Sequence, residues 1–196
     1  DDKLKKSILQ EAIQGRLVPQ ITEEGTAQEL LEQIKQEKLH LLKEGKLKKS
    51  ALVDSVIYKG DDNKYYEQVG KSDKEITEEI AFDLPNGWSW CRLKDICSIF
   101  TGATFKKEET VTTKEGVRIL RGGNISPFEL RIKDDDIFLT KDKVKEDIIL
   151  KENDILTPAV TSLENIGKMV RVNSDMPNTT VGGFVFIIRL YLKNQW

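Results

Sequence analysis

The chain has 196 residues, of which 38% are hydrophobic and 33% charged, and its formal net charge is −2. Composition and length are those of a water-soluble chain of one or two domains. No apolar run reaches the roughly 18 residues that a membrane-spanning helix needs. Residues 1–6 lack the apolar core of a signal peptide, so the expected location is the cytoplasm. Two cysteines and one histidine are too few for a disulfide scaffold or a four-thiolate zinc site.

The acidic side chains are concentrated in the middle of the chain. Residues 51–90 carry nine acidic and four basic side chains, whereas residues 91–196 carry 15 acidic and 17 basic ones. The overall negative charge therefore does not exclude a polyanionic partner for the last part of the chain.

The first 50 residues have the pattern of two helices. Apolar residues at positions 4, 8, 9, 12 and 13 share one helical face, and Gly15 occupies the place of a left-handed C-terminal residue. The second helix is expected over residues 26–49, because Thr26 and Glu29 form a capping box at its start. Lys38 interrupts the apolar stripe of this helix. The stripe consists of Leu30, Leu31, Ile34, Leu41 and Leu42.

An isolated rod of this kind is not stable in water, so its stripe must be covered by the first helix, by another chain, or by both. An ordinary helical hairpin and a coiled-coil spacer or assembly surface are both open interpretations.

Residues 51–84 are interpreted as an acidic connector with turns near Gly60 and Gly70, and the Leu-Pro-Asn-Gly turn at 84–87 marks a domain boundary. Short β segments separated by turns follow from residue 88 onward. The last of them is almost wholly apolar, which predicts a central strand buried on both faces. The β segments are expected at 117–120, 136–139, 154–156, 169–172 and 184–190.

The predicted fold class is therefore α+β. A helical hairpin or coiled-coil spacer spans residues 1–50, the acidic connector spans 51–84, and a mixed, mainly β domain spans 85–196.

Motifs of catalysis and cofactor binding are missing from the sequence. The pair Gly167 and Lys168 suggests a phosphate-binding loop, but that motif requires glycine at 162 and serine or threonine at 169, where the chain has Ser162 and Met169. Dinucleotide-binding, zinc-protease and nucleophile-elbow motifs are absent as well. We therefore expect no cofactor, no metal and no catalytic residue.

Four loops instead combine glycine with hydrogen-bond donors, at 101–107, 118–124, 161–168 and 179–183. Taken singly, each can be explained by turn geometry with solvated lysine and arginine. Their clustering favours a surface that binds a polyanion, because Lys and Arg suit phosphates while Arg and Asn suit base edges. The candidate DNA contacts are Lys106, Lys107, Arg118, Arg121, Asn124, Ser162, Asn165, Lys168, Thr179 and Thr180.

Several of these segments, in this order, resemble the specificity subunit of type I restriction-modification enzymes. The stretches that carry the resemblance are ILQEAIQGRLVP at 8–19, ELLEQIK at 29–35, KEGK at 43–46, LPNGWSW at 84–90, RGGNI at 121–125, NDIL at 153–156 and NIGK at 165–168.

The resemblance implies a subunit that reads DNA and catalyses nothing. A target recognition domain of this family binds half of a bipartite duplex site, and long helices space two such domains and dock the modification subunits. Those subunits are S-adenosylmethionine-dependent methyltransferases, and restriction subunits join through them.

In this chain residues 1–50 correspond to the helical region and 85–196 to one recognition domain. That domain is shorter than is usual in the family and is expected to be truncated, so the second helix is free to self-associate with a second copy. The alternative is a coiled-coil assembly module whose β portion is inert or binds protein.

Overall fold

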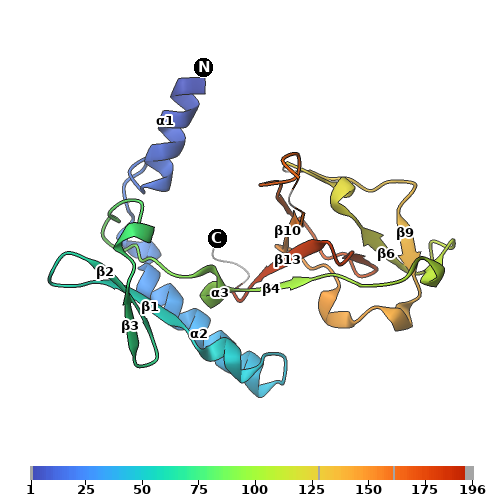
Figure 1. Cartoon of the computed structure of the whole chain (residues 1–196), viewed down its shortest axis with the longest axis horizontal. Helices are drawn as coiled ribbons and strands as arrows, with labels where there is room; N and C mark the ends of the chain where they lie inside the picture. The colour runs from blue at the N-terminus through green and yellow to red at the C-terminus, as the bar shows by residue number, and fades with distance from the viewer. Residues whose placement is uncertain (1, 128, 161, 193–196) are drawn as a thin grey trace. The chain divides into compact units, whose positions relative to one another are not determined.

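The computed structural model describes residues 2–127, 129–160 and 162–192, and its contacts divide the chain into two compact units, Asp1–Ile96 and Cys97–Trp196 (Figure 1). Helices and several small sheets are both present, so the predicted α+β class is confirmed. Residue 85, where the sequence predicts the second domain to begin, lies within the first unit.

Two helices open the first unit, α1 (Asp2–Ile13) and α2 (Ala27–Lys43), with short 3₁₀ turns at Thr22–Glu24 and Lys49–Leu52. Gly15 ends the first helix with a φ of 65°. The predicted capping box is confirmed: the Thr26 hydroxyl accepts from the Glu29 amide at 3.2 Å, and the Glu29 carboxylate accepts from the Thr26 amide at 2.8 Å. Both local signals therefore act as the sequence indicates.

The predicted extension of the second helix to residue 49 is wrong. Gly45 adopts a φ of 72° directly after the helix, and the Lys46 amide donates back to the Leu41 carbonyl at 2.9 Å. A left-handed glycine with such a bond closes the last turn and satisfies a carbonyl that a longer helix would have used.

The two apolar stripes differ in burial. On α2 Ile34 is buried and Leu30, Leu31, Leu41 and Leu42 are half-buried. On α1 no described residue is buried; Leu4, Ile8, Leu9 and Ile13 of its stripe are exposed, and Ala12 is half-buried. The α2 stripe is thus covered within the first unit, whereas the α1 stripe is not.

Lys38 does not interrupt the α2 stripe, as the sequence suggested, but continues it. Its side chain is fully buried four residues after Ile34, and its ammonium pairs with Asp54 and lies 3.5 Å from the Asp95 carbonyl oxygen. The Asp95 carboxylate in turn accepts from the Ser55 hydroxyl at 2.7 Å. A buried ammonium is tolerated where a carboxylate and a carbonyl replace its water.

The acidic segment forms a three-stranded antiparallel sheet of β1 (Ser55–Lys59), β2 (Tyr65–Val69) and β3 (Ser72–Glu75). Its strands are joined by tight turns, with Asn63 at a φ of 67° and Gly70 at 62°. A 3₁₀ turn (Thr77–Glu79) and the short helix α3 (Leu93–Ile96) complete the unit. The region interpreted as a connector is thus regular structure.

Two stretches that carry the family resemblance, 8–19 and 84–90, meet within the first unit beside the start of α2. A Cβ built on Gly15 would lie 2.8 Å from Pro85 Cγ and 2.9 Å from the Trp88 ring, so only glycine fits there. The Trp88 indole donates to Gln20 Oε1 at 2.6 Å, and the Ala27 amide at the start of α2 donates to the Gly87 carbonyl at 2.8 Å. The Pro-Asn-Gly-Trp turn therefore fixes the entry of α2.

The second unit contains two four-stranded sheets and a hairpin. One sheet has the order β11-β10-β13-β4, formed by Val170–Arg171, Ile155–Pro158, Val185–Leu190 and Cys97–Thr101. The other has the order β12-β6-β9-β5, formed by Thr179–Val181, Val117–Leu120, Ile137–Leu139 and Thr110–Val111. The hairpin pairs β7 (Ile125–Ser126) with β8 (Glu129–Leu130).

The strand pairs are antiparallel except for β12 with β6. Short 3₁₀ turns lie at Lys107–Glu109, Gly122–Asn124, Lys141–Lys143 and Glu146–Ile148.

Two apolar clusters form the core of the second unit. The larger contains Leu120, Ile125, Leu150, Leu156, Val170, Val172, Val181, Val185 and Ile187, and the smaller contains Ala103, Val117, Ile119 and Leu139. β13 is an interior strand of its sheet, as the sequence predicts.

Its predicted burial on both faces holds only in part. The face that carries Val185 and Ile187 is buried in the larger core cluster. On the opposite face Ile188 is buried, but Phe186 remains 37% exposed beside Thr101 and Thr157 of the neighbouring strands.

Candidate nucleic-acid interface

Four segments of the second unit, three of which contain glycine, converge into what we call the glycine-loop cluster, residues 101–105, 120–124, 157–160 and 181–184. The Ala103 amide donates to the Val181 carbonyl at 2.8 Å, and the Gly182 amide donates to the Leu120 carbonyl at 2.8 Å. The Ala159 amide donates to the Phe184 carbonyl, also at 2.8 Å. Parts of three predicted loops, which are far apart in sequence, therefore lie side by side, and the segment that leads into the 161–168 loop joins them through Ala159.

Glycine is required where these segments touch. A Cβ on Gly102 would lie 1.8 Å from the Val181 carbonyl oxygen, and one on Gly183 would lie 3.0 Å from Thr104 Oγ1. Gly122 is less crowded, because a Cβ there would lie 3.8 Å from Pro158 Cβ. The glycines at 102 and 183 let the backbones approach closely and hold the cluster together.

Asn124, predicted to contact DNA, is buried, and its amide serves the fold. Asn124 Oδ1 accepts from the Arg121 amide at 2.8 Å, while Nδ2 donates to the Arg131 carbonyl at 2.8 Å and to Asp136 Oδ1 at 2.6 Å. Both donor positions and the acceptor are in use, so this side chain has no group left to read a base.

Thr179 and Thr180 are buried in strand β12, and the Thr180 hydroxyl donates to the Ile148 carbonyl at 2.5 Å. Sequence analysis assigned them to a loop because a Gly-Gly pair follows at once. The parallel pairing with β6 explains why they form a strand instead.

Arg118 is also held by the fold. Its guanidinium donates to Asp136 Oδ2 at 2.9 Å and lies 4.8 Å from the centre of the Phe138 ring. Burial raises the pKa of Asp136, but the Lys133 amide, Asn124 and Arg118 together outweigh burial and hold that pKa below its usual range. The charge of Arg118 is therefore matched by a carboxylate that stays ionised at neutral pH.

The remaining predicted donors lie at the surface. Arg121 is 46% exposed and donates to Asp135 at 3.2 Å through Nη2. Ser162, Asn165 and Lys168 form a chain in which Lys168 Nζ lies 3.2 Å from Asn165 Oδ1 and Asn165 Nδ2 lies 2.7 Å from Ser162 Oγ.

Lys106 and Lys107 are exposed beside the 101–105 segment. Thr161, the first residue of the predicted third loop, lies outside the described residues.

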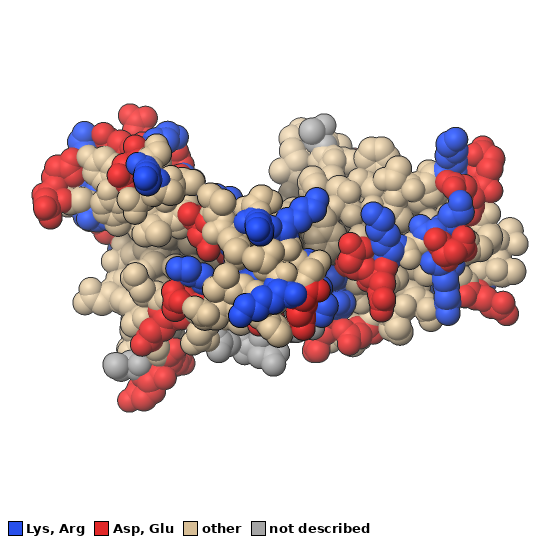
Figure 2. Space-filling model, turned by 90° about the horizontal axis from the view of Figure 1, so that it is seen from below, with Lys and Arg blue, Asp and Glu red and all other residues tan. Residues whose placement is uncertain are grey.

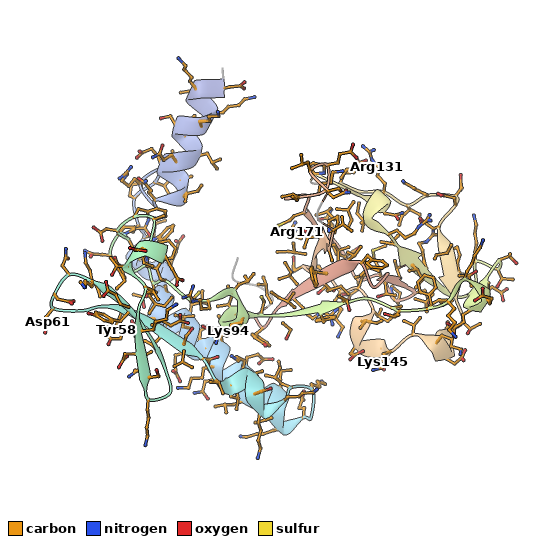
Figure 3. All side chains as sticks on the ribbon, viewed as in Figure 1. Tyr58, Asp61, Lys94, Arg131, Lys145 and Arg171 are labelled. Atoms are coloured by element: carbon orange, nitrogen blue, oxygen red, sulfur yellow. The ribbon has the colours of Figure 1, made fainter. Side chains whose placement is uncertain are left out.

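Acidic and basic side chains are mixed on the face of the molecule that Figure 2 presents. Arg131 pairs with Glu129 at 2.6 Å and Lys143 with Glu109 at 3.3 Å. In Figure 3, Arg131 and Lys145 lie on opposite sides of the second unit. Any affinity for an anion must therefore arise locally at the loops.

Sequence reasoning missed the exposed apolar side chains at these loops. Phe184 is 79% exposed and Leu163 is 91% exposed, and Val160 and Ile166 are also exposed. The prediction that Phe184 belongs to the buried strand at 184–190 is wrong, because β13 begins at Val185 and Phe184 lies in the exposed turn that follows two glycines.

Among residues 2–127, 129–160 and 162–192, no group of three or more His, Cys, Asp or Glu side chains is placed to hold a metal ion. In the same part of the chain, no helix has both the length and the apolar character needed to cross a bilayer. Cys97 is buried and Cys91 half-buried, and burial raises the pKa of the Cys91 thiol.

No protein-family model matches the chain. Curated relatives are specificity subunits of type I restriction enzymes, so the resemblance seen in the sequence is confirmed. The type I restriction enzyme EcoAI specificity subunit of Escherichia coli is 37% identical over 180 residues, which are 90% of this chain and 27% of that protein. The EcoEI specificity subunit of the same organism is 40% identical over 95 residues, covering 48% of this chain and 13% of that protein. The chain spans about a quarter or less of the length of these relatives.

Two solved structures are also similar. One is the crystal structure of the HsdS subunit from Thermoanaerobacter tengcongensis, with 18% identity, a TM-score of 0.43 and coverage of 56% of this chain and 25% of that one. The other comes from work on complex assembly in the type I restriction-modification system, with 18% identity, a TM-score of 0.42 and the same coverage.

Proposed function

We propose that this chain recognises duplex DNA for a type I restriction-modification system in the cytoplasm and performs no catalysis itself. The observation that carries the proposal is the 37% identity to the EcoAI specificity subunit over 90% of the chain. The second unit binds half of a bipartite site, and methylation and cleavage belong to the modification and restriction subunits with which the chain assembles.

The contact surface in this proposal is the glycine-loop cluster together with the 162–168 loop. Arg121, Ser162, Asn165 and Lys168 supply donors there, and Lys106 and Lys107 extend the surface toward phosphates. The other predicted contacts act indirectly. Arg118, Asn124, Thr179 and Thr180 fix the backbone of the loops that carry the exposed donors.

The helices of the first unit serve as the spacer and as the docking site for the modification subunits. The support is the exposed apolar stripe of α1, formed by Leu4, Ile8, Leu9 and Ile13, which is available to a partner helix.

DNA binding is tested with the full chain and a pool of random-sequence duplexes at several salt concentrations. Lys168→Ala is expected to reduce the slope of log affinity against log salt by about one if Lys168 contacts a phosphate. Arg121→Ala is expected to cost about 1–3 kcal/mol at one position of the selected site if Arg121 contacts a base.

Lys145→Ala is the matched control, because Lys145 is exposed but lies across the second unit from Arg131 (Figure 3). Absence of binding to every duplex at low salt would exclude the proposed function. Unchanged affinity and salt slope in both variants would exclude only these contacts.

A second candidate is an assembly module that associates through its helices, and the exposed α1 stripe is the observation that favours it. Sedimentation of the full chain is expected to show dimers that Leu9→Ser with Ile13→Ser abolishes, while Val53→Ser, an exposed apolar control in the same unit, leaves them intact. A wild-type chain that stays monomeric at all concentrations contradicts this candidate and leaves the DNA-binding proposal standing.

A further inference from the structure

Phe184 is an aromatic side chain presented to solvent by a rigid turn. It lies in the turn between β12 and β13, which the Val185 amide closes by donating to the Gly182 carbonyl at 3.0 Å. Val181 and Val185, on either side of the turn, are buried in the core. The backbone of Phe184 is therefore anchored while its ring remains 79% exposed.

The neighbours of this turn are the donor-bearing loops. The Phe184 carbonyl accepts from Ala159, the residue from which the loop with Asn165 and Lys168 departs. Gly182 is bonded to Leu120, the residue before Arg121. An exposed phenyl ring thus projects from the same cluster as an arginine, with a lysine and an amide on the adjoining loop.

Such an arrangement matches the way proteins deform a duplex. Phe and Leu side chains that insert between base pairs partially unstack one step and kink the helix, while neighbouring cations hold the phosphates. An anchored backbone lowers the entropy that such a ring loses on insertion.

We propose that Phe184 is a wedge that unstacks one base step of the bound duplex, with Leu163 of the adjoining loop as a second apolar contact. The inference rests on the proposed function and adds to it the means of reading DNA: specificity comes in part from the cost of deforming one step. The flanking arginine, lysine and amide favour DNA over a protein partner, because these groups suit phosphates and base edges.

The test uses the full chain and the duplexes it enriches from a random-sequence pool. Permanganate oxidises unstacked thymines, and energy transfer between dyes on the two duplex ends reports bending. Wild-type protein is expected to raise permanganate reactivity about fivefold at one step and to shorten the end-to-end distance. Phe184→Ala is expected to abolish both signals and to weaken binding about five- to tenfold, whereas Phe184→Trp retains them.

Ile99→Ala is the matched control, because Ile99 is 47% exposed on β4, opposite Ile188 on the same sheet. Binding by the wild-type chain with neither raised reactivity nor bending overturns the wedge and leaves the proposed function intact. Failure to bind any duplex overturns both. A Phe184→Ala variant that loses association with the modification subunit while unstacking DNA normally identifies Phe184 as a protein contact and also overturns the wedge.

Discussion

The two units are stabilised in different ways. In the described part of the first unit, the fully or nearly fully buried groups include Lys38 and Asp95 beside Ile34 and Ile76. In the second unit, two apolar clusters are buried, and the buried charges Asp136 and Asp154 each pair with an arginine at the edge of the core. The first unit thus includes a fully buried lysine paired with Asp54, whereas the second has two apolar clusters beneath its exposed loops.

Removing Lys38 is expected to have the largest effect. Lys38→Ala leaves the Asp54 and Asp95 groups without their buried cation and is expected to cost about 3 kcal/mol of stability. Hydrogen exchange should accelerate in α2 and β1 and stay unchanged in β10 and β13. Lys35→Ala, on the exposed side of the same helix, is the control and should change stability by less than about 0.5 kcal/mol. Equal acceleration in both units would show that they do not unfold separately.

A smaller effect is expected from Asn124 in the second unit. Asn124→Ala removes the donor to Asp136 Oδ1 and the partners of two backbone groups, and is expected to cost about 2 kcal/mol in urea unfolding. Asn165→Ala is the matched control, because its amide bonds only at the surface of the 162–168 loop. If the two variants lost equal stability, the distinction between a buried Asn124 that supports the fold and a surface Asn165 that does not would be wrong.

The stability that Asp136 gives the second unit is expected to depend on pH. Its pKa lies below the usual range in the folded unit, so its contribution to stability is full above the unfolded value of about 3.9 and is lost as pH falls through the folded value. The difference in urea midpoint between wild type and Asp136→Asn is therefore expected to shrink below about pH 4. A difference that persisted unchanged to pH 2 would contradict the depressed pKa.

The smallest effect is expected at exposed ion pairs. Glu129→Gln removes the partner of Arg131, but both side chains are more than half exposed. The change in unfolding free energy should stay within about 0.5 kcal/mol, as measured by urea denaturation. A larger loss would mean that the β7–β8 hairpin depends on this pair.

Local chemistry could be predicted from the sequence, and long-range pairing could not. The capping box at Thr26 and the left-handed Gly15 depend on residues a few positions away, and both predictions are confirmed. The burial of Lys38 depends on Asp54 and Asp95, which lie 16 and 57 positions along the chain. No helical periodicity contains that information.

The candidate site shows the same limit. The four glycine loops could be found from their composition, and the structure brings parts of three of them together with the segment that precedes the fourth. Which donors point outward could not be found in this way. Asn124 directly follows two glycines and Asn165 stands two residues before Gly167, so their sequence contexts do not distinguish them. Only Asn124 has Asp136 beside it in the folded chain.

The contact of Gly15 with Pro85 and Trp88 has a consequence for biosynthesis. The start of α2 lacks its acceptor until Gly87 has been made, and Gln20 lacks its indole donor until Trp88 has been made. The first unit of the nascent chain can therefore finish folding only after Trp88 has left the ribosomal tunnel. Until then the start of α2 and the segment between the helices lack the hydrogen bonds that Gly87 and Trp88 provide.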